Sequence, residues 1–261
     1  MRGWEVACGG ALAVLCSAGC KSTDSGNGKQ VGELGRGVFG YVCGSGADAQ
    51  CNDNADVAIV DPSTNLPVVA VGGSFFVTYA SNASSTNNVP DGHTDTVDTT
   101  FIDVDPTGTQ YVAKRAGYAV LYGLQGTVAM TACHAVSCDG DAPEDLVHLL
   151  LQPVDHIEFA HSAVMGGSFK QEVTTPGGGM VSLTVNGQPL TELFRVVPMT
   201  KDRNLLAGSL PIMWTSSDTS VGQITTDPTQ NIITLQLEKA GTTMLTATLA
   251  TMMGTLTVTV N

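Results

Sequence analysis

Apolar and polar side chains alternate strictly in several short runs between Leu210 and Val260. One run covers Ile232–Leu237, and two later runs place Leu245, Ala247 and Leu249, then Leu256, Val258 and Val260, on one face each. Successive side chains of a β-strand point to opposite faces, so the alternation predicts strands that bury one face. Turn-forming residues separate the runs at short intervals. The pattern therefore predicts an antiparallel β-sandwich.

The order of residues in this part resembles bacterial immunoglobulin-like domains of the intimin/invasin-type group. The resemblance rests on four motifs: Trp214-Thr-Ser-Ser-Asp218, Lys239-Ala-Gly-Thr242, Leu245-Thr-Ala-Thr248 and Leu256-Thr-Val-Thr-Val260. It covers about the last 100 residues, the size of one such domain. It implies a fold and no single activity, because such domains serve as spacers, adhesion modules and binding modules. Within it, Trp214 is predicted to anchor the core, and its removal to unfold this unit alone.

A weak internal repeat indicates a second sandwich nearer the N-terminus. Val71–Thr78 parallels Gly177–Thr184, and Ala113–Gly117 parallels Leu237–Gly241. The chain has 261 residues, and domains of about 100–150 residues are the most common size. We therefore predict an all-β protein with two tandem immunoglobulin-like antiparallel sandwiches, separated near Pro153. Its predicted segments are a signal peptide at 1–19, a flexible tether at 20–30, and sandwiches at 31–152 and 153–261.

The N-terminus carries a targeting segment. Arg2 is followed by the apolar run Val6–Cys16, which is too short to cross a bilayer as a mature helix. The sequence Ser17-Ala18-Gly19-Cys20 resembles a bacterial lipobox, which implies cleavage before Cys20 and lipidation of that residue. Lys21 after the cysteine resembles lipoproteins of the outer membrane. Ordinary secretory cleavage nearby and a misplaced start are the alternatives.

The first unit resembles, more loosely, myxobacterial-type lipoproteins in its Tyr41-Val42-Cys43 and Ala70-Val71-Gly72 strands. Seven cysteines are present, of which Cys8 and Cys16 leave with the signal and Cys20 carries lipid. The remaining four form two close pairs, Cys43 with Cys51 and Cys133 with Cys138. In an oxidising compartment these pairs predict local disulfides, each contributing about 2–2.5 kcal/mol. Crossed pairing is the rival, and the spacing does not match a CxxC zinc site.

The charge balance excludes one class of partner. The chain has 11 Lys+Arg against 24 Asp+Glu, a formal net charge of −13, and contains no basic run. Phosphate neutralisation by clustered Lys and Arg is what drives nucleic-acid binding, so no nucleic-acid partner is expected. The membrane is expected as a partner only through the N-terminal lipid.

No recognisable catalytic motif occurs in the sequence. It has no Gly-x-Ser-x-Gly elbow, no phosphate-binding loop and no His-Glu-x-x-His helix. Its five histidines, which are His93, His134, His148, His156 and His161, fall in expected strands or turns. We therefore predict no catalytic residue, no cofactor and no metal site, and a protein that is not an enzyme.

The stretch Ala80–Thr100 lacks apolar periodicity and is predicted to be a long exposed loop that builds no core. Five aspartates crowd this loop and the strand after it: Asp91, Asp95, Asp98, Asp103 and Asp105. Their spacing is not that of an EF-hand, and Ca²⁺ binding is the alternative to a solvated acidic loop. Spacing, partner binding and Ca²⁺ ordering are the three roles considered for it.

Two classes of function remain. The first is a surface or periplasm-facing lipoprotein of the cell envelope that acts as a non-catalytic structural, adhesion or binding module. The second is a subunit of an envelope assembly, or an enzyme whose site no motif reveals. Sequence identifies neither the protein or carbohydrate partner nor the oligomeric state.

Overall fold

A computed structural model describes residues 29–42, 66–81, 92–96, 99–104, 110–125, 143–163, 170–172, 179–184, 189–227, 231–250 and 252–261. These residues form 18 β-strands. Within the described ranges no helix is long and apolar enough to cross a membrane. The all-β class predicted from the alternating pattern is confirmed.

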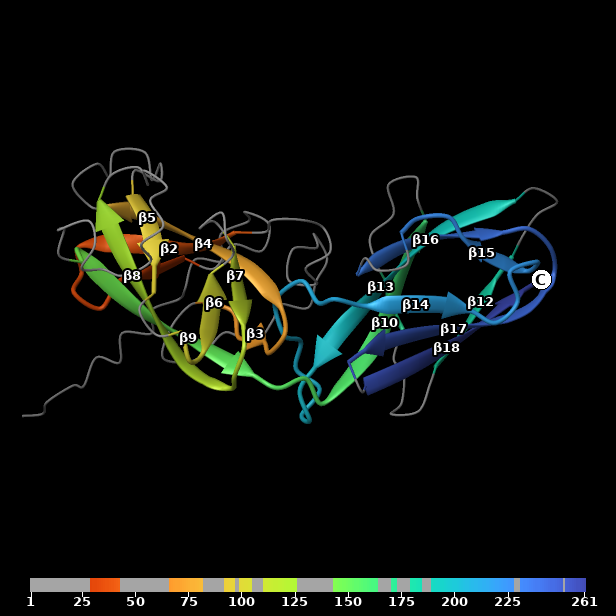
Figure 1. Ribbon diagram of the computed structural model, residues 1–261. Coiled ribbons are helices and arrows are strands. Elements are labelled where there is room, and N and C mark those ends of the chain that lie inside the picture. The colour runs from red at the N-terminus through yellow and green to blue at the C-terminus, as the bar shows by residue number, and fades with distance from the viewer. Residues whose placement is uncertain are drawn as a thin grey trace, which may run out of the picture.

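The N-terminal strands form two facing sheets (Figure 1). The first has the spatial order β1 (Lys29–Val31), β2 (Gly37–Val42), β4 (Ser74–Ser81), β7 (Tyr111–Ala113), β6 (Ile102–Val104). The second has the order β3 (Val69–Ala70), β9 (Asp145–Gln152), β8 (Gly117–Gln125), β5 (Gly92–Asp95). The first strand begins at Lys29, inside the stretch predicted to be a tether, because its three residues pair with β2.

The C-terminal strands form a second pair of sheets, drawn from green to blue in Figure 1. One has the order β11 (Lys170–Glu172), β10 (His156–Ala163), β13 (Leu190–Met199), β16 (Ile232–Leu237), β15 (Gly222–Ile224). The other has the order β12 (Gly179–Leu183), β18 (Met252–Val260), β17 (Gly241–Leu249), β14 (Met213–Ser216). The predicted boundary after Gln152 falls between β9 and β10.

The two sheet pairs share one topology. Position by position, β2, β4, β7 and β6 correspond to β10, β13, β16 and β15, and β3, β9, β8 and β5 to β12, β18, β17 and β14. In each pair the last strand also runs parallel to an early one, β9 to β3 and β18 to β12, whereas the other strand pairings are antiparallel. The internal repeat is therefore visible in the strand order.

One half of the predicted repeat is confirmed and the other is wrong. Gly117 and Gly241 both open the penultimate strand of their sheet pair with positive φ values of 139° and 153°. This agrees with the match of Ala113–Gly117 to Leu237–Gly241, because glycine adopts such backbone at little cost. The match of Val71–Thr78 to Gly177–Thr184 fails, since β4 corresponds to β13 and β12 to β3.

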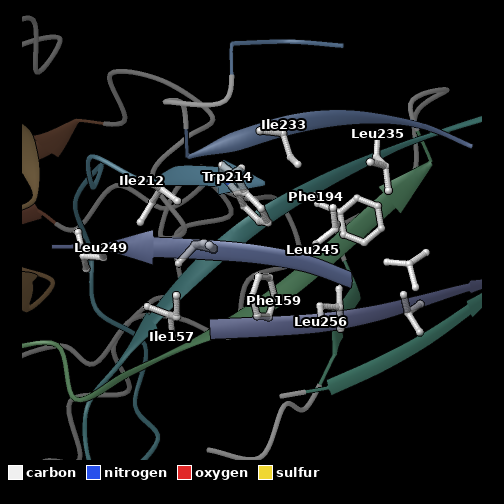
Figure 2. Close-up of a cluster of buried hydrophobic side chains, with 14 of the residues drawn as sticks. Ile157, Phe159, Phe194, Ile212, Trp214, Ile233, Leu235, Leu245, Leu249 and Leu256 are labelled. Carbon is white, nitrogen blue, oxygen red and sulfur yellow. The ribbon is translucent and has the colours of Figure 1, made fainter. Parts of the chain in front are cut away.

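Each sheet pair encloses its own cluster of buried apolar side chains. In the C-terminal cluster the indole of Trp214 packs edge-on against Phe159, with ring centroids 5.7 Å apart. Figure 2 shows both rings in the space between the sheets, among Leu245, Leu256 and Ile233. The predicted burial of Trp214 is confirmed, and so is the inward face of the last two strands.

The prediction that Ala80–Thr100 is an exposed loop without a role in the core holds for Thr99 and Thr100, which form an exposed turn, and is wrong for residues 80–81 and 92–96. Gly92–Asp95 forms β5 and pairs with β8. The Thr94 hydroxyl is buried, donates to the Val77 carbonyl at 2.9 Å and accepts from the Tyr111 hydroxyl at 2.8 Å. Threonine can enter a core when backbone and side-chain partners satisfy its hydroxyl, and apolar periodicity does not reveal this.

The buried hydroxyl of Tyr111 makes stability depend on alkaline pH. Burial raises the pKa of Tyr111 above its ordinary value, the Thr94 hydrogen bond opposes this in part, and the charge of Asp95 adds to it. The folded protein therefore holds this proton to higher pH than the unfolded chain, in which tyrosine ionises near pH 10. The stability that this provides is complete below about pH 10 and is lost as the pH rises toward the folded pKa.

We accordingly expect the urea midpoint to fall as the pH rises above about 10, and Tyr111→Phe to flatten that decline. Tyr118→Phe, at an exposed position of β8, is the matched control and leaves the decline in place. Equal alkaline slopes for wild type and Tyr111→Phe would show that this hydroxyl is not the responsible group.

Candidate functional site

The most unusual described feature is a junction between the two sheet pairs. The connection from β13 to β14 leaves the C-terminal sheets and pairs with the segment around β3. The Ala207 amide donates to the Val68 carbonyl at 2.8 Å, and the Ala70 amide donates to the Ala207 carbonyl at 2.8 Å. Ser74 and Ser209 exchange both backbone hydrogen bonds, each at 2.8 Å. These four bonds join residues far apart in the sequence.

Two glycines allow the two backbones to meet. A Cβ placed on Gly73 would lie 3.3 Å from the Gly208 Cα and 2.9 Å from the Ala70 carbonyl oxygen. A Cβ placed on Gly208 would lie 3.2 Å from a Val69 methyl, and Gly208 has a φ of 103°. Side chains larger than hydrogen therefore conflict with the junction at both positions.

The junction also exchanges side chains between the two cores. Leu205 and Ala207, from the C-terminal half, are buried in the N-terminal cluster. Val68 and Ala70, from the N-terminal half, are buried in the C-terminal cluster together with Leu206. Neither core is complete without residues of the other half.

A charged contact fixes the turn that begins this connection. The Arg203 amide donates to the Thr200 carbonyl at 3.0 Å, and Arg203 itself has a left-handed φ of 59°. Its Nη2 lies 2.5 Å from Oε1 of Glu158, a fully buried carboxylate, and Nε2 of His156 lies 3.6 Å from the same oxygen. A buried charge is costly unless it is paired, so this contact stabilises the turn.

A second buried carboxylate organises the start of the fold. Asp145, at the first position of β9, is fully buried. Its side chain accepts backbone N–H bonds from Leu34 at 2.8 Å, Arg36 at 2.6 Å and Gly37 at 2.9 Å. A Cβ on Gly32 would lie 2.2 Å from the Asp145 Cγ, so the turn wraps closely around the carboxylate. This anchors the turn between β1 and β2 to β9.

The predicted site residues fall in two groups. Cys20 and His134 lie outside the described residues. So do the four predicted disulfide residues, Cys43, Cys51, Cys133 and Cys138, and three of the five aspartates, Asp91, Asp98 and Asp105. The described aspartates are separately engaged: Asp95 accepts from the Thr96 amide at 2.7 Å, and Asp103 forms an ion pair with Lys114 at 2.9 Å. Among the described residues no group of three or more His, Cys, Asp or Glu could hold a metal ion.

The described histidines take part in local contacts. His148 of β9 contacts Glu33 in the turn between β1 and β2. His161 lies 3.5 Å from Glu192, with its ring stacked on Phe194. His156 contacts Asp155 at 3.0 Å, and His93 lies in β5. Sequence reasoning missed the junction itself; its only signal is a glycine in each partner, within Gly72-Gly73 and Ala207-Gly208-Ser209.

Comparison with known proteins assigns no family. No family model matches the chain, and no curated protein matches it. Several solved structures show a distant likeness to the chain. S-layer protein SbsC domains 4 and 5 are 14% identical, with 74% of this chain and 93% of that chain covered and a TM-score of 0.25. The D0-D1 domain of intimin is 12% identical, with 73% of this chain and 91% of that chain covered and a TM-score of 0.21. A chimeric titin Z1Z2 is similar at 11% identity, 74% and 91% coverage, and TM-score 0.24. At such TM-scores these likenesses place the chain in none of these groups.

Proposed function

We propose that the protein is a non-catalytic, stiff structural module of the bacterial cell envelope, held to the membrane by a lipid on Cys20. The observation that carries the proposal is the junction, with its four backbone hydrogen bonds and exchanged core residues. Tandem domains joined only by a linker move relative to each other by default. A junction of this kind removes that freedom, which suits a module that must hold something at a set distance or orientation.

The roles of the buried charged groups support the non-catalytic part of the proposal. Asp145 is occupied by backbone amides, and Glu158 by Arg203. Glu144, which is only half-buried, accepts from the Tyr79 and Ser81 hydroxyls at 3.0 and 3.1 Å. Catalytic acids and bases need a position from which they reach a substrate, whereas these carboxylates hold strands together.

Small-angle X-ray scattering of residues 21–261, which are the mature chain without the lipidated Cys20, tests the stiffness. We expect one conformation to account for the wild-type curve. Gly208→Val should require an ensemble of orientations, because its side chain collides with Val69 and Gly73 at a positive φ. Gly35→Val is the control, since Gly35 also has a positive φ of 70° but no atom within 4 Å of an added Cβ. A wild-type curve that already requires freely varying orientations would contradict the proposal.

The anchor and the disulfides are separate parts of the proposal. Metabolic palmitate should label the wild type and not Cys20→Ala, and equal labelling of both would remove the anchor. Non-reducing peptide mapping distinguishes Cys43–Cys51 and Cys133–Cys138 from crossed pairing. Affinity capture from detergent-solubilised envelopes addresses the second candidate, a subunit of an envelope assembly, which predicts stoichiometric partners that a spacer does not.

A further inference from the structure

The outer face of the sheet β12-β18-β17-β14 has an unusual composition. Across neighbouring strands, Met180 pairs with Thr257, which pairs with Met244. In the same way Met213 pairs with Thr248, which pairs with Met253. A row of three threonines lies between these two rows: Thr215, Thr246 and Thr255. We call these nine residues the methionine face.

The four methionines of this face are open to solvent. Met180 is 70% exposed, Met253 66%, Met213 50% and Met244 43%. They are the exposed large hydrophobic side chains of the described C-terminal half, and they are all thioethers. Their exposure follows from the strand period, since Leu245, Ala247, Leu256 and Val258 take the inward positions of β17 and β18.

Two other described methionines face inward. Met199, at the end of β13, is 3% exposed and belongs to the N-terminal cluster. Met252 is partly buried and packs against the C-terminal cluster, although it is the direct neighbour of Met253 in the chain. The described methionines are thus of two kinds, four exposed on the methionine face and two packed against the buried clusters.

We propose that the methionine face is a reversible oxidation site that accepts oxygen atoms from peroxides. A sulfur lone pair attacks one oxygen of hydrogen peroxide, an S–O bond forms as the O–O bond breaks, and the second oxygen leaves as water after proton transfer. Each sulfur loses two electrons and becomes a sulfoxide, and each peroxide is reduced to water. Susceptibility follows access of the oxidant to the sulfur, which the four outward methionines provide.

Oxidation changes the character of this face and leaves the fold intact. The nine residues carry no charge, on a chain whose formal net charge is −13, so the thioethers dominate the apolar character of the face. Sulfoxides are polar and convert an apolar face into a polar one. The same change at Met199 would break core packing, whereas the outward methionines belong to neither buried cluster.

A peroxide time course on the mature chain, followed by peptide mapping, tests the site. We expect the four methionines of the face to form sulfoxides at least about tenfold faster than Met199 does. Met252 and Met253 are the matched comparison, because they share one peptide and fragment ions distinguish them. Met253 should oxidise first. Equal rates for the six methionines that the structure describes, measured in the folded protein, would overturn the proposal.

A second measurement separates the site from general damage. The species with four sulfoxides should keep the melting temperature of the untreated protein within about 3 °C, and elute earlier from a hydrophobic-interaction column. Joint treatment with both stereospecific classes of methionine sulfoxide reductase should restore the original elution. A variant with all four positions changed to Leu should lose the part of the elution shift that these four methionines cause. Unfolding that accompanies the first sulfoxides, or an elution time that does not change, would contradict the inference.

Discussion

Trp214→Ala is expected to destabilise the protein by about 3–5 kcal/mol, the range for removing a large aromatic side chain from a core. Trp214 is among the largest fully buried side chains and packs on Phe159 between the C-terminal sheets. Such a loss is a large share of the roughly 5–15 kcal/mol that stabilises a domain. Met213→Ala is the control, because Met213 is the adjacent residue and points outward.

The effect of Trp214→Ala should reach the N-terminal half as well. The sequence alone predicts that the first sandwich survives this substitution. The junction argues otherwise, because unfolding of the C-terminal sheets withdraws Leu205 and Ala207 from the N-terminal cluster. We therefore expect hydrogen exchange of β8 and β9 to accelerate in the variant. Unchanged protection of these strands would show that the halves are independent after all.

The fluorescence of the mature wild-type chain provides a simple check of Trp214. The sequence contains two tryptophans, and Trp4 lies in the predicted signal peptide. The remaining indole is buried, so its emission should lie at the short wavelengths typical of an apolar environment. Emission at the wavelength of water-exposed indole from the folded chain would contradict its place in the core.

Asp145→Ala is expected to cost about 3 kcal/mol or more, because it leaves three backbone N–H groups of one turn without their acceptor. The amides of Leu34, Arg36 and Gly37 all donate to this carboxylate. The N-terminal strand should detach, since the turn is what joins it to β9. Urea denaturation measures the loss, and protease sensitivity near Arg36 shows the detachment.

Two further variants sharpen this test. Asp145→Asn keeps the size and one acceptor oxygen, so it should lose less stability than Asp145→Ala. Asp155→Ala removes a half-exposed carboxylate whose described side-chain contact is His156. This substitution should have little effect on stability. If Asp145→Ala cost no more stability than Asp155→Ala, the hydrogen-bond account would fail.

The alternating pattern was sufficient to predict the last strands of the C-terminal half. Ile232–Leu237 has the predicted bounds, and strands occur at the predicted runs around Trp214, Leu245 and Leu256. Each of these strands buries one apolar face, and the period-two pattern reports that burial directly. The same reasoning predicts the burial of Trp214, which follows from its place on an apolar face.

The features that the sequence did not reveal rest on polar groups or on long-range pairing. β5 contributes Thr94 to the core through hydroxyl hydrogen bonds, and β1 is three residues held by its neighbour. Asp145 reads as part of an acidic turn, yet it is buried because distant backbone amides surround it. The junction depends on two glycines, Gly73 and Gly208, which lack side chains at the point where the two backbones meet. The sequence does not show that these two backbones come together.

The junction also sets an order of events during biosynthesis. Ser74 and Ser209, which pair there, are separated by 135 positions in the chain. A chain that is synthesised from its N-terminus presents Ser74 long before Ser209 follows, and contacts this distant in sequence form slowly. The half of the molecule that emerges first therefore cannot be completed until most of the second half has been made. Until residues 205–209 arrive, its core lacks Leu205 and Ala207, and the apolar surface that these residues would cover stays exposed, which is the state in which folding intermediates aggregate.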